Sequence, residues 1–486
     1  MRLRAWILLL LMATLPACNE GSSGGIGPEQ RPDTGSRVFR LDLGQAGSQR
    51  VDVLVVNPSA DGAPMEVAFD TEPAPAGPAA AKPAESGRDL PRVIYEAEMQ
   101  QIDRCLQSRG QYRSELGRGE RARFQQLAPG STLDFFIATT GSSVTCQKLL
   151  DESQTVHCVV MGELVAGQPV VSQQTALDIA RAFDSDNPFR PGSGIYDQVR
   201  AAFGSEWNSN PPGGRDGDSK VVLVLLSSRT IGGSTFFGFF RPSDEFSRAE
   251  IGSSNEGEIL YVNVEVEPFD YLATMAHEFQ HMVRFNQKFL RNGAFDGTRE
   301  EGTLDEGCAV NAEEICGYSL TAAGGGNSFM FGACESYLES AGGTNLFDFN
   351  GSFQFYGGGY LLVRYFREHF GEDAFRTFNM NTGTGYQNMV EVSGLTGGEL
   401  FRRFSLALLT SGFTGPVPDE GRFPSGFSTV GTFEIRGMGT VALPGLQPVQ
   451  TSSQLSSLSV PAFAPVLLRL EGASSPVVVA GSAAGD

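Results

Sequence analysis

The segment His277-Glu-Phe-Gln-His281 constrains the fold most, because it spaces two histidines to share one face of a helix. Residues four apart lie one turn apart on an α-helix, so both imidazoles can reach a single metal ion. On a helical projection the apolar residues form one stripe, and both histidines fall outside it. A histidine that packs in a core lies more often within the stripe. The sequence therefore predicts a helix over residues 271–290, capped by Asp270, that carries a metal site.

A catalytic zinc ion needs a third protein ligand and one open position. The chain has 4 histidines, and no third histidine lies near the motif. Glu306 is the predicted third ligand, because it lies opposite the apolar stripe of a second predicted helix, over residues 303–318. The alternative is a solvated acidic face, which is common on helices. Glu313 is predicted to orient a ligand histidine, whereas Asp305 is expected to be solvated.

Glu278 follows the first histidine directly and is not expected to bind the metal. Its position predicts a general base that takes a proton from a zinc-activated water and later delivers it to the leaving amine. The pattern therefore predicts a hydrolase that cleaves peptide bonds, with a protein or peptide as its substrate.

These residues resemble the hyicolysin-type neutral metallopeptidases of bacteria. The resemblance rests on the run from His277 to Phe285, on Asp305-Glu306-Gly307, and on the glutamate seven positions after Glu306. More broadly, the chain is similar to the gluzincin class, in which the third ligand is a glutamate on a following helix. The similarity covers residues 171–415 and implies a peptidase with one Zn²⁺ per chain. It leaves the choice between endopeptidase and exopeptidase open, and we expect an endopeptidase.

Two further points concern the family pattern. The family usually has Trp-Leu-Asn-Glu-Gly-Leu where this chain has Thr-Leu-Asp-Glu-Gly-Cys around Glu306, so the ligand is kept while its packing differs. Tyr356 precedes three glycines and a predicted helix over residues 359–370. It resembles the oxyanion tyrosine of the aminopeptidase branch of gluzincins, and the alternative is a tyrosine that only packs.

The first residues have the order of a bacterial export signal. Two arginines precede a short apolar run, and Leu-Pro-Ala-Cys18 follows it like a lipobox. We expect residues 1–17 to be a signal peptide and Cys18 to be lipidated, with residues 18–36 as a tether. Cleavage before a free cysteine is the alternative. Asn19 in place of Asp predicts the outer membrane of the cell envelope, if the source is Gram-negative.

The cysteine count suits an oxidising compartment. The chain has 7 cysteines, and lipidation of Cys18 leaves an even number for disulfides. Cys146 and Cys158 flank a predicted hairpin and are a candidate disulfide, whereas the pairing of the other four stays open.

The predicted fold is α+β: a zincin-like metallopeptidase domain with a mixed sheet and active-site helices, flanked by N- and C-terminal β regions. Composition shifts and strand patterns divide the chain after the tether. The expected units are a small β unit (37–70), a Pro/Ala-rich linker (71–92), a β-rich region (93–170), the metallopeptidase domain (171–415) and a C-terminal β region (416–486).

The net charge of −20 argues against nucleic-acid partners, because such a surface repels phosphate backbones. The remaining alternative to an enzyme is a non-catalytic surface lipoprotein that uses a metallopeptidase-like fold for binding. The intact Glu278 favours the enzyme, because a binding protein has no need of the base.

Overall fold

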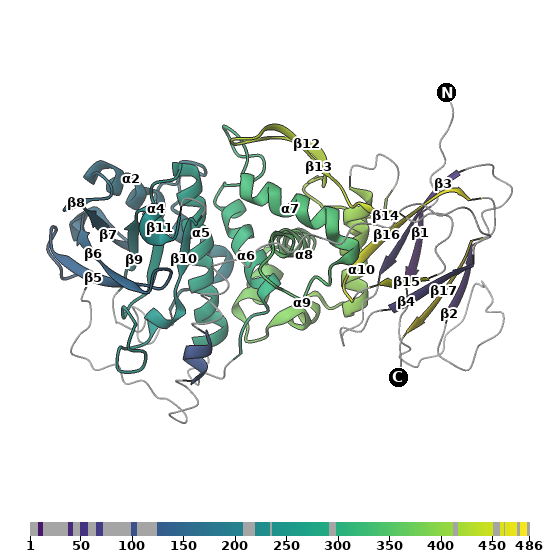
Figure 1. The fold of residues 1–486 in the computed structure, drawn as a ribbon, viewed down its shortest axis with the longest axis horizontal. Helices are drawn as coiled ribbons and strands as arrows, with labels where there is room; N and C mark the ends of the chain where they lie inside the picture. Colours follow the sequence, from purple (N-terminus) through teal and green to yellow (C-terminus); the bar gives the residue numbers. More distant parts are fainter. Residues whose placement is uncertain are drawn as a thin grey trace.

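The computed structural model of the chain shows a mixed α+β fold, with a sheet at one end, helices in the middle and two smaller sheets at the other end (Figure 1). The residues that the structure describes are 8–12, 37–41, 49–56, 65–70, 99–104, 124–207, 219–233, 236–290, 298–411, 417–450, 457–460, 462–473 and 477–483.

The largest sheet has seven strands in the order β10-β11-β9-β7-β6-β5, with β8 paired to β7. Neighbours β11, β9 and β7 run parallel, and the other pairs are antiparallel. Strands from both sides of the boundary expected at residue 170 share this sheet, because β7 pairs with β9. The strands are β5 (Thr132–Ile137), β6 (Ser142–Lys148), β7 (Cys158–Val165), β8 (Gln168–Pro169), β9 (Val221–Leu226), β10 (Gly238–Phe240) and β11 (Ile259–Asn263).

Strand β9 shows why this sheet is covered on both faces. All its residues are buried, as its unbroken run of branched apolar side chains predicts. Val221, Leu223 and Leu225 pack into the main core with the helices. The alternate residues of β9 pack into a smaller core with Phe124 and Phe135 on the opposite face.

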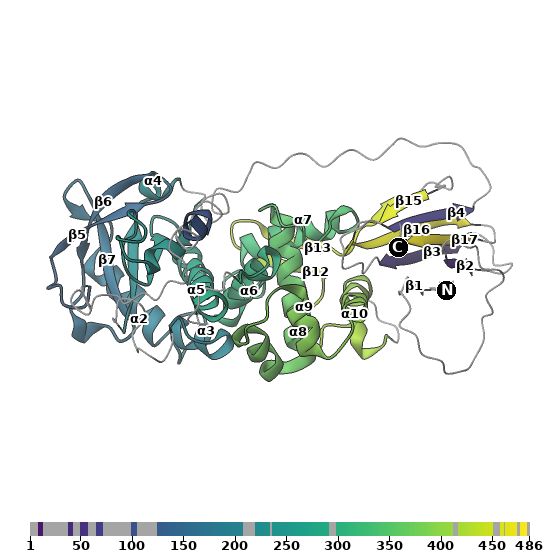
Figure 2. The same cartoon turned by 90° about the horizontal axis from the view of Figure 1, so that it is seen from below.

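The helices supply the rest of the main core, and α5 lies between the sheet and α6 (Figures 1 and 2). α6 in turn packs against α8, and α8 packs against α7. Besides a helical stretch over residues 99–104, the helices are α2 (Gln173–Asp184), α3 (Ile195–Phe203), α4 (Ser228–Ile231), α5 (Pro268–Arg284), α6 (Gly302–Ile315), α7 (Ser328–Ser340), α8 (Phe353–Met380), α9 (Gly385–Ser393) and α10 (Gly397–Thr410).

Helix α5 begins three residues earlier than predicted and continues beyond Arg284 as a π-helical turn. Pro268 opens it, because the fixed φ of proline suits the first helical position. Asp270 is therefore inside the helix, and the prediction that it caps the helix was wrong: the N-cap residue is Glu267, without a side-chain cap.

Helix α8 begins at Phe353, so Tyr356 and the three glycines after it are helical. Glycine is a poor helix former, which is why the sequence predicted a later start. Tertiary packing explains the glycines. A Cβ added at Gly359 would lie 2.2 Å from the carbonyl oxygen of Thr303, and one added at Gly307 would lie 2.5 Å from the backbone of Gly359. The backbones of α6 and α8 therefore touch beside Glu306.

The N- and C-terminal β regions are not separate units. Their strands interleave in two four-stranded sheets, β1-β3-β16-β14 and β15-β4-β17-β2, because β16 pairs with β3 and β17 pairs with both β2 and β4. Pairing of this kind is long-range and leaves no signal in local sequence patterns. The strands are β1 (Leu8–Met12), β2 (Arg37–Leu41), β3 (Gln49–Val56), β4 (Met65–Asp70), β14 (Pro448–Gln450), β15 (Ser457–Val460), β16 (Pro465–Ala473) and β17 (Val477–Ala483).

A separate hairpin of β12 (Val430–Ile435) and β13 (Gly439–Pro444) precedes the four C-terminal strands of these sheets. Strand β1 comes from the apolar run of the expected export signal and pairs in parallel with β3. Cys18, the tether and the linker lie outside the described residues.

The predicted disulfide between Cys146 and Cys158 was wrong. Both cysteines are free and buried, and they lie in different cores on opposite faces of the sheet. Within the described ranges the three cysteines of α6, its C-terminal end and α7 are also free and buried. Side chains alternate between the two faces of a sheet along each strand. The register of β6 and β7 therefore places Cys146 and Cys158 on opposite faces, where they cannot form a disulfide.

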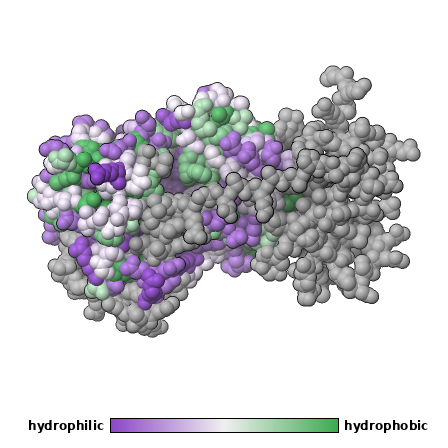
Figure 3. All heavy atoms as spheres, in the orientation of Figure 1, coloured by the Kyte–Doolittle hydropathy of each residue, from purple (hydrophilic) through white to green (hydrophobic). Residues whose placement is uncertain are grey.

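None of the helices in the described ranges is long and apolar enough to cross a membrane. Figure 3 shows hydrophilic and hydrophobic residues interspersed over the described part of one face.

Candidate metal centre

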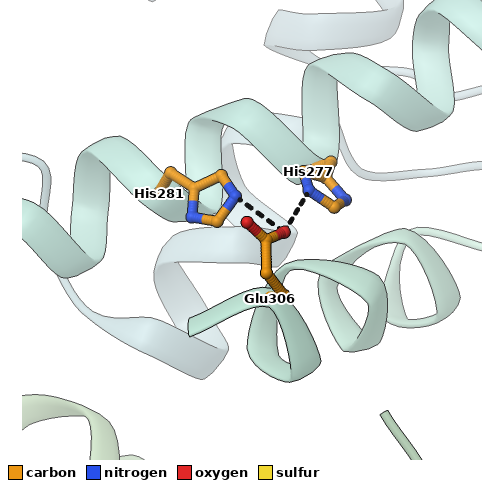
Figure 4. Close-up of side chains that lie close together, drawn as sticks. All are labelled: His277, His281 and Glu306. Carbon is orange, nitrogen blue, oxygen red and sulfur yellow. Dashed lines mark hydrogen bonds and ion pairs between the residues drawn. The ribbon is translucent and has the colours of Figure 1, made fainter. Parts of the chain in front are cut away.

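Helices α5 and α6 bring three possible metal ligands together (Figure 4). His277 and His281 project from α5 toward Glu306 on α6. The Oε2 atom of Glu306 lies 3.2 Å from Nε2 of His277 and 3.4 Å from Nε2 of His281. One ligand atom from each of the three residues lies within 4.8 Å of the others. The two helices therefore converge at the three residues that the sequence predicted.

This geometry fits a tetrahedral zinc ion. Two ligand atoms on zinc, each about 2.0–2.1 Å from the metal, are about 3.3 Å apart at a tetrahedral angle. The separations of 3.2 and 3.4 Å between Glu306 and the two imidazoles match that value. Two imidazole nitrogens and one carboxylate also form a donor set common in catalytic zinc sites, with the fourth position left open.

The first imidazole is held from behind by a buried chain of hydrogen bonds. Nδ1 of His277 lies 2.7 Å from Oε1 of Glu313. The other carboxylate oxygen of Glu313 accepts a hydrogen bond of 2.6 Å from the Nδ2 of Asn327, which also caps α7. A carboxylate on Nδ1 leaves Nε2 facing the ligand position, and it fixes the ring. The structure thus places Glu313 where the sequence suggested, and it adds Asn327.

The second imidazole also has a carboxylate behind it. Nδ1 of His281 lies 3.3 Å from Oδ1 of Asp305, whose side chain is 13% exposed. Asp305 in turn lies 3.9 Å from the buried Arg284. The expectation that Asp305 is solvated was therefore wrong, because it lies in the α5–α6 contact. A ligand histidine usually has a carboxylate or carbonyl near its other ring nitrogen. Applied to His281, this rule could have predicted a role for Asp305.

Glu278 is half-buried, and the edge strand of the sheet holds it. Its Oε2 accepts a hydrogen bond of 2.8 Å from the backbone N–H of Phe240 in β10. This hydrogen bond restrains the carboxylate of Glu278 through Oε2, and Oε1 takes no part in the bond. The residue therefore has a defined orientation one position along the helix from a metal ligand.

The electrostatics favour a cation between α5 and α6. Burial lowers the pKa of His277, but its hydrogen bonds with Glu306 and Glu313 raise it to about 10. Burial also lowers the pKa of His281, and the nearby carboxylates raise it well above its ordinary value. Burial raises the pKa of Glu306, but the two imidazoles lower it to about 2. Burial raises the pKa of Glu278. A metal ion must therefore displace protons from the imidazoles when it binds.

Tyr356 is buried and is linked to the site through an aromatic neighbour. Its ring is 6% exposed and meets Phe329 edge-on, at 5.5 Å between centroids. Phe329 in turn meets the ring of His277, at 6.4 Å. Tyr356 thus packs in an aromatic cluster that reaches the first ligand.

Comparison with known proteins gives one partial similarity. No protein-family model matches the chain. The neutral metalloprotease ShpI of Staphylococcus hyicus is 29% identical to it over 157 residues. This match covers 30% of the chain and 32% of ShpI, so the chain spans about a third of the relative's length. The similarity supports a relationship to metallopeptidases in general, and the narrower hyicolysin type stays a prediction.

Proposed function

We propose that the protein is a zinc-dependent peptidase, and an endopeptidase in particular, with a zincin-like domain built from the mixed sheet and helices α5 and α6. The observation that carries this proposal is the convergence of His277, His281 and Glu306 at separations suited to one tetrahedral metal ion. The partial similarity to a neutral metalloprotease supports the same reaction class.

The chain's own residues have separate tasks in this proposal. His277, His281 and Glu306 would hold the metal, while Glu313 fixes the ring of His277 by a hydrogen bond and Asp305 lies 3.3 Å behind the ring of His281. A zinc ion bound there would supply Lewis-acid activation of a water molecule and of the scissile carbonyl.

Glu278 moves the proton. Its carboxylate takes a proton from the attacking water and delivers it to the nitrogen that leaves. The backbone N–H of Phe240 keeps one oxygen in place during both steps. Burial raises the pKa of Glu278, which makes the carboxylate a better proton acceptor.

Tyr356 is proposed to donate a hydrogen bond to the oxygen that gains negative charge in the reaction. Its support is its position in α8, where it packs on the same phenylalanine that contacts His277. We also propose that the protein is exported and attached to the bacterial cell envelope through a lipid on Cys18.

Glu278→Gln tests the enzyme against the binding-protein alternative. Glutamine keeps the shape of the side chain and removes its basicity, so the variant should keep its zinc and its fold. Peptide turnover should fall by about 10²–10⁴-fold. The assays are zinc content by atomic absorption and hydrolysis of casein and fluorogenic peptides.

Glu372→Gln is the matched control, because it removes the same charge at an exposed position in α8. Wild-type turnover in Glu278→Gln would remove the proposed mechanism. Absence of hydrolysis in the zinc-loaded wild type would favour the binding lipoprotein.

A further inference from the structure

Three phenylalanines and Tyr356 form an aromatic cluster beside the metal centre. Phe329 comes from the first turn of α7, and Phe353 opens α8. Their rings lie 5.5 Å apart, and Phe329 also contacts Tyr356. Phe349 closes the cluster, at 5.9 Å from Tyr356. The first turns of two helices therefore direct aromatic rings into one place.

The cluster is open to solvent on one side. Phe353 is 55% exposed, and within the described ranges it is the aromatic member of the small set of strongly exposed large apolar side chains. An exposed aromatic ring leaves apolar area in water that a ligand can cover. Phe329 is half-buried beneath it, so an apolar group that covers Phe353 would also reach Phe329.

The position of the cluster indicates what covers it. Phe329 meets the ring of His277 edge-on, so the aromatic surface continues from the metal ligand to Phe353. A peptide with its scissile bond at the metal advances by about 3.3 Å per residue when extended. The ring centroids of His277 and Phe329 are 6.4 Å apart and those of Phe329 and Phe353 are 5.5 Å apart, so a side chain within three residues of that bond can reach both rings.

We infer that Phe329 and Phe353 form a subsite for an apolar, preferably aromatic, side chain of a peptide substrate. This inference rests on the proposed peptidase function and names the substrate class. A substrate ring gains edge-to-face contacts with Phe329 and covers the exposed face of Phe353. Acidic side chains are disfavoured there, because a carboxylate placed against aromatic rings loses hydration and gains no hydrogen-bond partner from them.

The test compares peptides that differ at a single position. A fluorogenic peptide series carries Phe, Leu, Ala or Asp at each of the three positions on either side of the bond that the wild type cleaves. We expect kcat/KM to be on the order of 10-fold or more higher for Phe than for Ala at one of these positions, and lowest for Asp. The protein used is the full chain loaded with zinc.

Phe353→Ala should bring the Phe-to-Ala ratio at that position close to one, and Phe353→Leu should restore part of it. Val156→Ala is the control, because it shortens an apolar side chain that is 63% exposed on the loop before β7. It should keep the wild-type ratio. Phe353 and Val156 are both exposed, so none of these three variants should unfold the protein.

Binding separates this inference from the proposed function. The same peptides are measured by fluorescence anisotropy against zinc-loaded Glu278→Gln protein, which needs no turnover. If the wild type cleaves nothing, the peptidase proposal fails. The ratio of binding affinities for the Phe and Ala peptides still tests the subsite. A Phe-to-Ala ratio that is equal in wild type and Phe353→Ala overturns the subsite, as does a preference for Asp at every position.

Discussion

Gly359→Ala tests whether the contact between α6 and α8 positions Glu306, the proposed metal ligand on α6. The added Cβ would lie 2.2 Å from the carbonyl oxygen of Thr303 and 3.2 Å from Cα of Gly307. Ordinary contacts of a carbon atom are about 3.5–4.0 Å, so the two helices must separate by roughly 1 Å. Glu306 lies between these two contact residues and must move with them.

Two opposite terms set the expected change in stability. Alanine in a helix interior is more favourable than glycine by about 0.5–1 kcal/mol. Overpacking in a tight contact costs about 1–3 kcal/mol. The net expectation for Gly359→Ala is a loss of up to roughly 2 kcal/mol. Because metal–ligand distances tolerate shifts of only about 0.2 Å, zinc affinity should fall by about 10- to 100-fold.

Gly332→Ala is the matched control. Gly332 lies inside α7, and a Cβ added there meets no atom within 4 Å. The same chemical change should therefore raise stability by about 0.5–1 kcal/mol and leave zinc affinity unchanged. The difference between the two variants isolates the cost of the helix contact, because the gain in helix propensity is common to both.

The assays are thermal unfolding of the metal-free protein and zinc affinity by competition with a chromophoric chelator. Both quantities are compared among wild type, Gly359→Ala and Gly332→Ala. Equal zinc affinity in all three proteins would refute the reasoning, even if Gly359→Ala were less stable, because it would mean that Glu306 does not depend on the helix contact.

Five further outcomes follow from the site and the N-terminus. Glu306→Ala should lose most of the roughly one zinc per chain that the wild type binds, and full retention in a metal analysis would contradict its role as a ligand. Glu313→Gln should lower zinc affinity by about 10- to 100-fold in the same chelator competition, because His277 loses its charged partner. Zinc affinity in the chelator competition should rise with pH until about pH 10, since a proton leaves His277 when the metal binds. The stability of the metal-free protein should show the opposite trend, falling as pH rises from the ordinary pKa of 6.5 toward about 10, and a flat denaturation profile would contradict the raised pKa. Cys18→Ala should abolish labelling by a fatty-acid probe, and equal labelling in both proteins would refute the lipid anchor.

The sequence could predict which side chains form the candidate metal site, because the spacing of the two histidines is local. Two histidines four apart are neighbours on one helix face and can share an ion there, so His277 and His281 indicate both the element and the ligand face. The buried strand β9 could be predicted for a similar reason, since a short unbroken run rich in branched apolar residues is typical of a strand covered on both faces. Glu306 needed one more step, because its distance from the histidines depends on how α6 packs on α5.

Only the tertiary structure decided which carboxylates lie near the Nδ1 atoms of the two proposed ligand histidines. Asp305 and Glu313 lie on one helix with several other acids, and only the crossing of α5 and α6 directs these two toward the imidazoles. The N- and C-terminal strands likewise pair across the length of the chain. The physical reason is the same in each case. Periodicity and composition act over a few residues, whereas a contact between distant segments depends on the free energy of the whole packed arrangement.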